Sequence, residues 1–171
     1  IGQELVASVQ EHGGIMTLQD LYAYRVRTRE PLETTAFGYR WVTAPPPSAG
    51  GFTMIQSLSI LAQAAGPKPA YGAPLLHQMA ESWKGPFLDR QSYFGDPDQV
   101  ILTLDQMMAP TRIDKRAKLV ADAKAHPSSD YALPVEWTQS RVTAPDNAGT
   151  SHFCVVDAEG NVASVTTTVN L

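Results

Sequence analysis

Hydrophobic residues near the N-terminal end follow the spacing of amphipathic helices. Residues 3–11 place three aliphatic side chains on one helical face, and the His-Gly-Gly sequence at 12–14 is typical of a helix end. Thr17 and Asp20 have the spacing of a capping box, in which the Asp20 side chain accepts a hydrogen bond from the Thr17 amide. The pattern therefore predicts two helices, the second of them short.

Residues 25–44 show a different pattern, in which β-branched and aromatic residues alternate with polar ones. This alternation predicts two short strands around Pro31. The Pro-Pro-Pro-Ser-Ala-Gly-Gly sequence at 45–51 predicts an extended polyproline II segment that leads into a helix over residues 52–64. The amides of the two glycines could bind an anion at the start of that helix, but a rigid connector is the simpler interpretation.

Two further stretches, residues 75–83 and 105–125, also have helical spacing. The second stretch predicts an apolar face that points inward and a basic face that points to solvent. The inward residues are Ile113, Ala117 and Val120, and the outward residues are Lys115, Arg116, Lys118 and Lys124. After Pro127 the chain turns polar and loses its periodicity up to residue 149, which predicts a loop or linker.

The last part of the chain has the alternation of a β-hairpin. Residues 152–157 and 161–170 both alternate, and the Ala-Glu-Gly sequence between them fits a three-residue loop with a left-handed glycine, Gly160. Side chains on one face of a hairpin meet in pairs that the loop length determines. The register that this loop imposes places Thr150 directly opposite Thr168. A two-residue loop would shift the register by one and place Thr167 opposite Thr150 instead.

Composition limits the classes of function. The chain has 171 residues, 43% of them hydrophobic and 18% charged, as expected for one folded domain with a hydrophobic core. Its formal net charge is -4, and no segment combines clustered cations with aromatic residues, which argues against a nucleic-acid partner. Polar residues interrupt the longest apolar run, so no membrane span is expected. Cys154 is the single cysteine, which excludes an internal disulfide.

Three carboxylates that lie close together in the sequence are candidates for a metal site. Asp89, Asp96 and Asp98 could supply the hard oxygen ligands that such a site needs. A turn followed by a helix cap explains the Gly-Asp-Pro-Asp sequence at 95–98 more simply, so we predict neither a metal nor another cofactor. The four histidines are separated from one another in the sequence, and we interpret each of them as structural.

The open end of the predicted hairpin carries Thr150, Thr168 and Asn170 on one face. A threonine directly after Gly149 permits N-terminal nucleophile chemistry. In that chemistry the Thr150 hydroxyl attacks the Gly149 carbonyl, the amide becomes an ester, and water frees Thr150 as a new chain terminus. The released amino group, whose ordinary pKa is about 8, can act as base for the hydroxyl of the same residue. Threonine-rich hairpins are also common as purely structural strands, so the residue types alone leave both interpretations open.

Three motifs resemble those of the γ-glutamyltranspeptidase family. Residues 149–161, Gly-Thr-Ser-His-Phe-Cys-Val-Val-Asp-Ala-Glu-Gly-Asn, and 165–170, Val-Thr-Thr-Thr-Val-Asn, are similar to the processing site and first hairpin of its small subunit. Residues 45–51 are similar to Pro-Pro-Pro-Ser-Ser-Gly-Gly of its large subunit. Ala-Glu at 80–81, Asp-Arg at 89–90 and Gly-Asp-Pro-Asp at 95–98 match a third family pattern in order. The resemblance covers essentially the whole chain.

The resemblance implies a role for each residue at the open end of the hairpin. Thr150 corresponds to the nucleophile, which autoprocessing exposes by breaking the bond after Gly149. Thr168 corresponds to the threonine that hydrogen-bonds the nucleophile, and Asn170 to a residue that contacts the γ-glutamyl group. Cys154 stands where the family usually has serine. The implied enzyme is a γ-glutamyl acyltransferase and hydrolase that transfers the γ-glutamyl group of glutathione and related donors to water, amino acids or peptides.

The implied fold class is α+β, as part of the αββα sandwich of N-terminal nucleophile hydrolases. Residues 1–126 would then form the mostly helical C-terminal part of a large subunit. Residues 127–149 would form a linker to the processing site, and residues 150–171 the first β-hairpin of the small subunit. The resemblance implies that this chain needs the remainder of the large and small subunits as its partners. It also implies a periplasmic or secreted location.

The chain has no start methionine and stops within a strand pattern. We therefore expect a fragment. The resemblance implies that it lacks most of the large subunit and nearly all of the small subunit, so we expect it to be catalytically inactive on its own. For the full-length protein, the alternatives to a transpeptidase are a cephalosporin acylase, a poly-γ-glutamate processing enzyme and a non-catalytic homologue.

Overall fold

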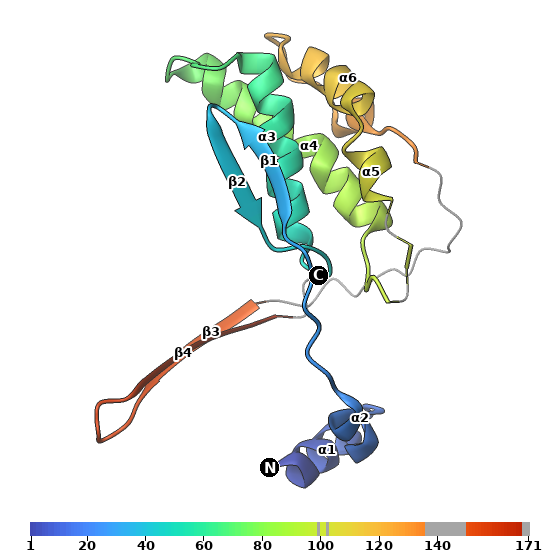
Figure 1. Ribbon diagram of the computed structural model, residues 1–171, viewed down its shortest axis with the longest axis vertical. Helices are drawn as coiled ribbons and strands as arrows, with labels where there is room; N and C mark the ends of the chain where they lie inside the picture. The colour runs from blue at the N-terminus through green and yellow to red at the C-terminus, as the bar shows by residue number, and fades with distance from the viewer. Residues whose placement is uncertain (99, 102, 136–149, 169–171) are drawn as a thin grey trace. The chain divides into compact units, whose positions relative to one another are not determined.

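The computed structural model describes residues 1–98, 100–101, 103–135 and 150–168 (Figure 1). The chain divides into two compact units, Ile1–Glu30 and Pro31–Leu171. The boundaries that the sequence suggests at residues 126 and 149 concern the subunits of a longer protein, and they stay predictions.

The first unit consists of two helices, α1 (Gly2–Glu11) and α2 (Leu18–Ala23). The predicted capping box is present, because the Thr17 amide donates to Asp20 Oδ2 at 2.7 Å and the Asp20 amide donates to Thr17 Oγ1 at 3.3 Å. The hydrogen bonds from the Thr17 side chain and amide lower the pKa of Asp20. Both predicted helices are confirmed.

The second unit opens with an antiparallel hairpin of β1 (Leu32–Ala36) and β2 (Tyr39–Thr43). Phe37 and Gly38 form its two-residue turn, and both have positive φ, 55° and 81°. Two strands were predicted, but residues 25–29 are not one of them. The turn at Phe37 and Gly38 pairs β2 with the residues after Pro31, so residues 25–29 have no strand to pair with among the described residues.

The proline-rich connector is a tight turn, so the prediction of an extended polyproline II segment is wrong. The Ser48 amide donates to the Pro45 carbonyl at 3.1 Å, and the Pro46–Pro47 peptide bond is cis. Helix α3 (Ala49–Ala65) begins directly after it, three residues earlier than predicted. A Cβ at Gly51 would overlap the Ala44 carbonyl oxygen, so glycine allows α3 to approach the chain that leaves β2.

Helix α4 (Ala73–Tyr93) is much longer than the helix predicted over residues 75–83. It continues through a fully buried proline, Pro86, a residue that usually ends a helix. The predicted helix over 105–125 is instead two helices, α5 (Leu104–Met107) and α6 (Pro110–Val120). Pro110 occupies the first position of α6, where its missing amide hydrogen is not needed.

Helix α3 packs against α4, α6 and β1 (Figure 1). The hydrophobic core joins α3, α6 and the short 3-10 helix η1 (Ser128–Tyr131), and its buried members are Ile60, Ile113, Ala117, Val120 and Tyr131. The three apolar residues of α6 point inward as predicted. The loop predicted after Pro127 begins instead with η1, whose last residue, Tyr131, is buried. Residues 136–149 of that predicted loop lie outside the described residues.

Arg116 is the exception on α6. The sequence predicts that it faces solvent with Lys115, Lys118 and Lys124, but its side chain is fully buried, at 0% exposure. Its guanidinium group instead forms an ion pair with Asp89 of α4. The three lysines are exposed as predicted.

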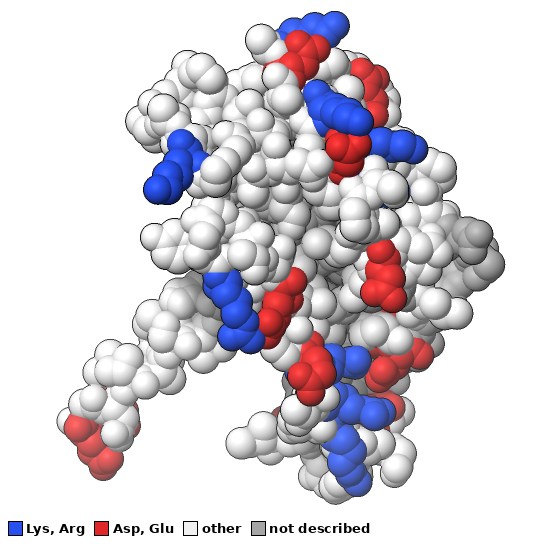
Figure 2. All heavy atoms as spheres, turned by 45° about the horizontal axis from the view of Figure 1, so that its top comes forward, with Lys and Arg blue, Asp and Glu red and all other residues white. Residues whose placement is uncertain are grey.

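Most other charged side chains of the described residues lie at the surface, unlike the buried Arg116 and Asp89 pair. On the face seen in Figure 2, Lys and Arg side chains lie among Asp and Glu side chains. Lys118 pairs with Asp114 at 2.7 Å while 75% of the lysine side chain stays exposed. Such exposed pairs contribute little to stability because solvent screens them.

Gly85 of α4 makes room for the buried Arg116. A Cβ at position 85 would lie 2.5 Å from Arg116 Nε, and the hydrogen bonds of the Arg116 guanidinium prevent it from moving aside. We therefore expect Gly85→Ala to destabilise the protein by about 1–3 kcal/mol. Gly50→Ala is the matched control, because nothing lies within 4 Å of a Cβ at Gly50 and alanine is normally favoured over glycine in helices. Thermal unfolding checks both, and a Gly85→Ala variant as stable as Gly50→Ala would contradict the prediction.

The described residues combine helices with two separate two-stranded antiparallel sheets. The mixed fold class is as predicted, while the αββα sandwich stays a prediction. Among these residues, no helix combines the length and hydropathy needed to cross a bilayer.

Candidate functional site

Thr150 and Thr168 lie at the open end of the second hairpin, which consists of β3 (Thr150–Val156) and β4 (Val162–Thr168). The strands are antiparallel, and Thr150 is the register partner of Thr168. Cys154 is the partner of Ser164, so the whole predicted register is confirmed.

The turn of this hairpin explains why its register could be predicted. Gly160 has φ of 85°, the left-handed conformation that the three-residue loop requires. The Asp157 carboxylate accepts hydrogen bonds from the Glu159 and Asn161 amides, each at 2.9 Å, and from the Asn161 side chain at 2.8 Å. These bonds, above all the one from the Asn161 side chain, lower the pKa of Asp157. The charged turn fixes which residues pair along both strands.

The Thr150 hydroxyl donates a hydrogen bond to Thr168 Oγ1 at 3.0 Å. Both side chains are exposed. A hydroxyl that donates its proton in a fixed direction keeps its oxygen lone pairs available for an electrophile. The hydrogen bond therefore gives the Thr150 hydroxyl a defined orientation at the open end of the hairpin.

The same face of the hairpin carries a further polar residue, His152. Its Nδ1 lies 2.8 Å from Thr166 Oγ1, and its Nε2 lies 3.3 Å from Ser164 Oγ and 3.4 Å from Cys154 Sγ. These contacts of His152 were not predicted from the sequence, where each histidine was interpreted as structural. The predicted hairpin register could have revealed them, because it places His152 opposite Thr166.

The opposite face of the hairpin is apolar along its middle and carries the Ser151 and Thr167 pair at its open end. Phe153, Val155 and Val165 alternate with the polar residues, and their exposed fractions are 50%, 54% and 38%. The exposed side chains of Phe153, Val155 and Val165 thus lie on the face opposite the Thr150 and Thr168 pair.

Two residues of the predicted site, Gly149 and Asn170, lie outside the described residues. The structure therefore describes the Thr150 and Thr168 members of the proposed set. Their roles in processing and substrate binding stay predictions.

Two of the three carboxylates considered for a metal site, those of Asp89 and Asp96, have other partners. Asp89 forms ion pairs with Arg112 and Arg116, and Asp96 Oδ1 accepts the Asp98 amide at 2.9 Å in the predicted turn. The turn does not lead directly into a helix, because the next helix among the described residues, α5, has Thr103 as its N-cap. In the part of the chain that the structure describes, no three His, Cys, Asp or Glu side chains form a group that could hold a metal ion.

Comparisons with known proteins agree with the motifs. A model of the family described as gamma-glutamyltranspeptidase matches residues 1–171. The glutathione hydrolase proenzyme of Escherichia coli (strain K12) is 33% identical over 171 residues, which cover 99% of this chain and 28% of that protein. The Acylase ACY 1 proenzyme of Pseudomonas sp. (strain V22) is 31% identical over 171 residues, which cover 99% of this chain and 29% of that protein.

A solved structure is similar as well. The crystal structure of Helicobacter pylori gamma-glutamyltranspeptidase matches with a TM-score of 0.66 and 28% identity, over 75% of this chain and 37% of that one. This chain thus spans well under half the length of the proteins it matches. With the family match over its whole length, the chain belongs to the gamma-glutamyltranspeptidase family.

Proposed function

We propose that the full-length protein is a γ-glutamyltranspeptidase and glutathione hydrolase that cleaves itself before Thr150. The observation that carries the proposal is the 3.0 Å hydrogen bond between the Thr150 and Thr168 hydroxyls at the open end of the hairpin. Family membership supports the activity, and the names of the relatives support the precursor, because two of them are proenzymes.

In the proposed processing step, Thr150 Oγ1 attacks the carbonyl carbon of Gly149. The C–N bond between the two residues breaks, an ester forms, and the nitrogen becomes the free amino group of Thr150. Water then hydrolyses the ester, which leaves Gly149 with a carboxylate and restores the Thr150 hydroxyl. Glycine at position 149 offers little steric hindrance to this attack.

In the proposed catalytic cycle, the same hydroxyl attacks the γ-carbonyl of the donor. The free amino group of Thr150 takes the hydroxyl proton and passes it to the leaving amine of the donor as the γ-glutamyl C–N bond breaks. The γ-glutamyl group is held as an ester on Thr150 until water or an amine accepts it and restores the hydroxyl. Thr168 orients the nucleophile, and Asn170 contacts the γ-glutamyl group.

The remainder of the large and small subunits would complete the site, so the 171-residue chain alone is expected to be inactive. We propose a periplasmic or secreted location, in keeping with the family resemblance. Glutathione is the proposed donor because the name of the Escherichia coli relative specifies glutathione.

An acylase is the second candidate, since one relative at 31% identity is named Acylase ACY 1 proenzyme. The two candidates share the nucleophile and differ in the acyl group they accept. Glutamate release from glutathione, measured beside side-chain release from an acylated cephalosporin, distinguishes them. Faster turnover of the cephalosporin would favour the acylase.

The role of Thr168 is tested by removing its hydroxyl while keeping its β-branched shape. We expect Thr168→Val in the full-length protein to lower kcat for γ-glutamyl release about tenfold or more, because a hydrogen bond to the reacting group is lost. Thr167→Val is the matched control, since Thr167 pairs with Ser151 on the opposite face. Its expected effect is under about twofold, and equal losses in the two variants would reject the proposed role.

A further inference from the structure

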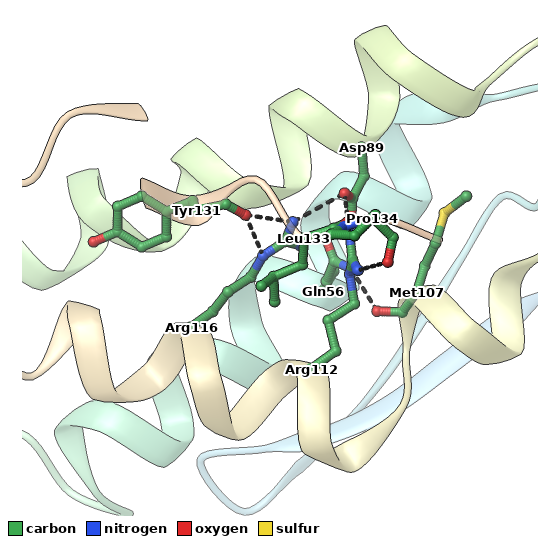
Figure 3. A network of polar contacts seen from close by, with 8 residues as sticks. All are labelled: Gln56, Asp89, Met107, Arg112, Arg116, Tyr131, Leu133 and Pro134. Atoms are coloured by element: carbon green, nitrogen blue, oxygen red, sulfur yellow. Dashed lines mark hydrogen bonds and ion pairs between the residues drawn. The ribbon is translucent and has the colours of Figure 1, made fainter. Parts of the chain in front are cut away.

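A buried ionic cluster joins α4 and α6 and contacts the backbone of residues 131–134 (Figure 3). Asp89 Oδ1 accepts from Arg112 Nη2 at 2.6 Å and from Arg116 Nη2 at 2.9 Å. Asp89 Oδ2 accepts from Arg116 Nη1 at 2.8 Å, from Gln56 Nε2 at 3.0 Å and from Arg112 Nε at 3.3 Å. Asp89, Arg112 and Arg116 are 1%, 6% and 0% exposed, so each arginine is held with two hydrogen bonds in a dry environment.

The charges in this cluster do not balance, because one carboxylate faces two guanidinium groups. A buried cation without full compensation is costly, and backbone carbonyl oxygens can supply the missing negative potential. The carbonyls that do so belong to residues 131–134. Arg116 donates to the Tyr131 carbonyl from Nε at 3.1 Å and from Nη2 at 2.9 Å. Arg112 donates to the Leu133 carbonyl at 2.5 Å and to the Pro134 carbonyl at 3.4 Å.

The Tyr131 side chain provides a second attachment of residues 131–134 to α4. It is 1% exposed, and its hydroxyl donates to Glu81 Oε2 at 2.7 Å. Lys84 donates to the other oxygen of Glu81 and to the His126 carbonyl, at 2.5 and 2.6 Å. Burial, followed by the bond to Glu81, raises the pKa of Tyr131, so the hydroxyl stays a donor at neutral pH. Residues 131–134 are therefore fixed to α4 and α6 through both backbone and side chain.

The segment at residues 131–134 and the bond to be broken belong to the same covalent chain before cleavage. Before cleavage, the chain that leaves the helices after Pro134 is covalently connected to Gly149, one side of the bond to be broken. After cleavage, Thr150 begins a separate chain and no longer depends on that connection. We propose that Arg112 and Arg116 are positioning residues for self-cleavage, which act by holding the Tyr131–Leu133–Pro134 backbone. This inference rests on the proposed self-cleavage before Thr150 and adds residues that the motifs do not include.

The test compares two forms of the full-length protein, the single-chain precursor and a split form. In the split form, the large subunit and a small subunit that begins at Thr150 are produced as separate chains. Arg112→Lys keeps the charge and removes the fork that reaches Asp89 and the Leu133 carbonyl together. We expect precursor cleavage, followed by intact mass over time, to slow about tenfold or more, since intramolecular attack depends steeply on geometry. In the split form, kcat/KM for γ-glutamyl release is expected within about twofold of wild type.

Arg40→Lys is the matched control, because it makes the same chemical change in an exposed ion pair with Glu33, and its cleavage rate is expected to equal that of wild type. Arg116→Lys, which loses the contact with Tyr131, serves as the second variant. Unchanged precursor cleavage in both cluster variants would overturn the inference and leave the proposed function intact. Equal losses in both forms, or failure of both variants to fold in the split form, would show a purely structural cluster and overturn it too. A wild-type precursor that stays whole would overturn the proposed function together with the inference.

Discussion

Thr150→Ala is expected to abolish cleavage of the full-length precursor and to lower γ-glutamyl release by at least about 10³-fold. The variant lacks the hydroxyl that attacks Gly149, so neither the ester nor the new chain terminus can form. It also lacks the donor of the 3.0 Å hydrogen bond to Thr168. Intact mass measures the first effect, and glutamate release from glutathione measures the second.

Thr150→Ser is the matched control for this experiment. Serine keeps a hydroxyl on Cβ and loses only the methyl group, so we expect measurable cleavage at a reduced rate. Ser151→Ala provides a second comparison, because Ser151 is the next hydroxyl residue and pairs with Thr167 on the other face. Cleavage of Thr150→Ala at the wild-type rate, or loss of cleavage in Ser151→Ala alone, would contradict the assignment of Thr150.

Asp89→Asn is expected to destabilise the protein by about 3–5 kcal/mol, because it leaves two buried guanidinium groups without their counter-ion. Arg112 and Arg116 are almost fully buried, so water cannot replace the lost charge. The amide also places a donor where Asp89 Oδ1 or Oδ2 now accepts from both arginines. Thermal unfolding of wild type and variant measures the loss.

Asp114→Asn makes the same chemical change in an exposed pair and serves as the control. Asp114 pairs with Lys118 at 2.7 Å, while 43% of the aspartate side chain is exposed. We expect its effect to be within about 1 kcal/mol, as for other exposed ion pairs. Equal melting temperatures of the two variants would show that the buried cluster does not carry the stability assigned to it.

The hairpin could be predicted from sequence because its information is local. Gly160 and Asp157 specify a single loop, and the period of two along the strands then fixes every pair from Val156 to Thr150. The Thr150 and Thr168 pair follows from that register without any knowledge of the rest of the fold. The contacts of His152 follow from it too, once the whole polar face is considered.

The buried cluster could not be predicted in the same way. Arg116 looks like a solvent-facing cation because its own helix carries lysines at neighbouring positions. Its burial depends on Asp89 and Gly85 of another helix. The need for glycine at position 85 is visible only in the folded structure, where a Cβ would overlap the Arg116 guanidinium group. A counter-ion and a space that residues of another helix provide leave no periodic pattern in the sequence.

The shape of the proline-rich connector was missed for a related reason. Three consecutive prolines favour an extended path by their φ angles. The observed turn is closed by a hydrogen bond between Ser48 and Pro45, and α3 begins at once because Gly51 allows it to pass close to Ala44. Tertiary approach of the helix to the end of β2 therefore decides the local conformation.

The most direct test of the proposed nucleophile is N-terminal sequencing, with intact mass, of the purified full-length protein. Self-cleavage predicts a second chain that begins Thr-Ser-His-Phe, from Thr150 onward, and that is absent in Thr150→Ala. A protein that stays whole under native conditions, or that breaks at another bond, would contradict the account.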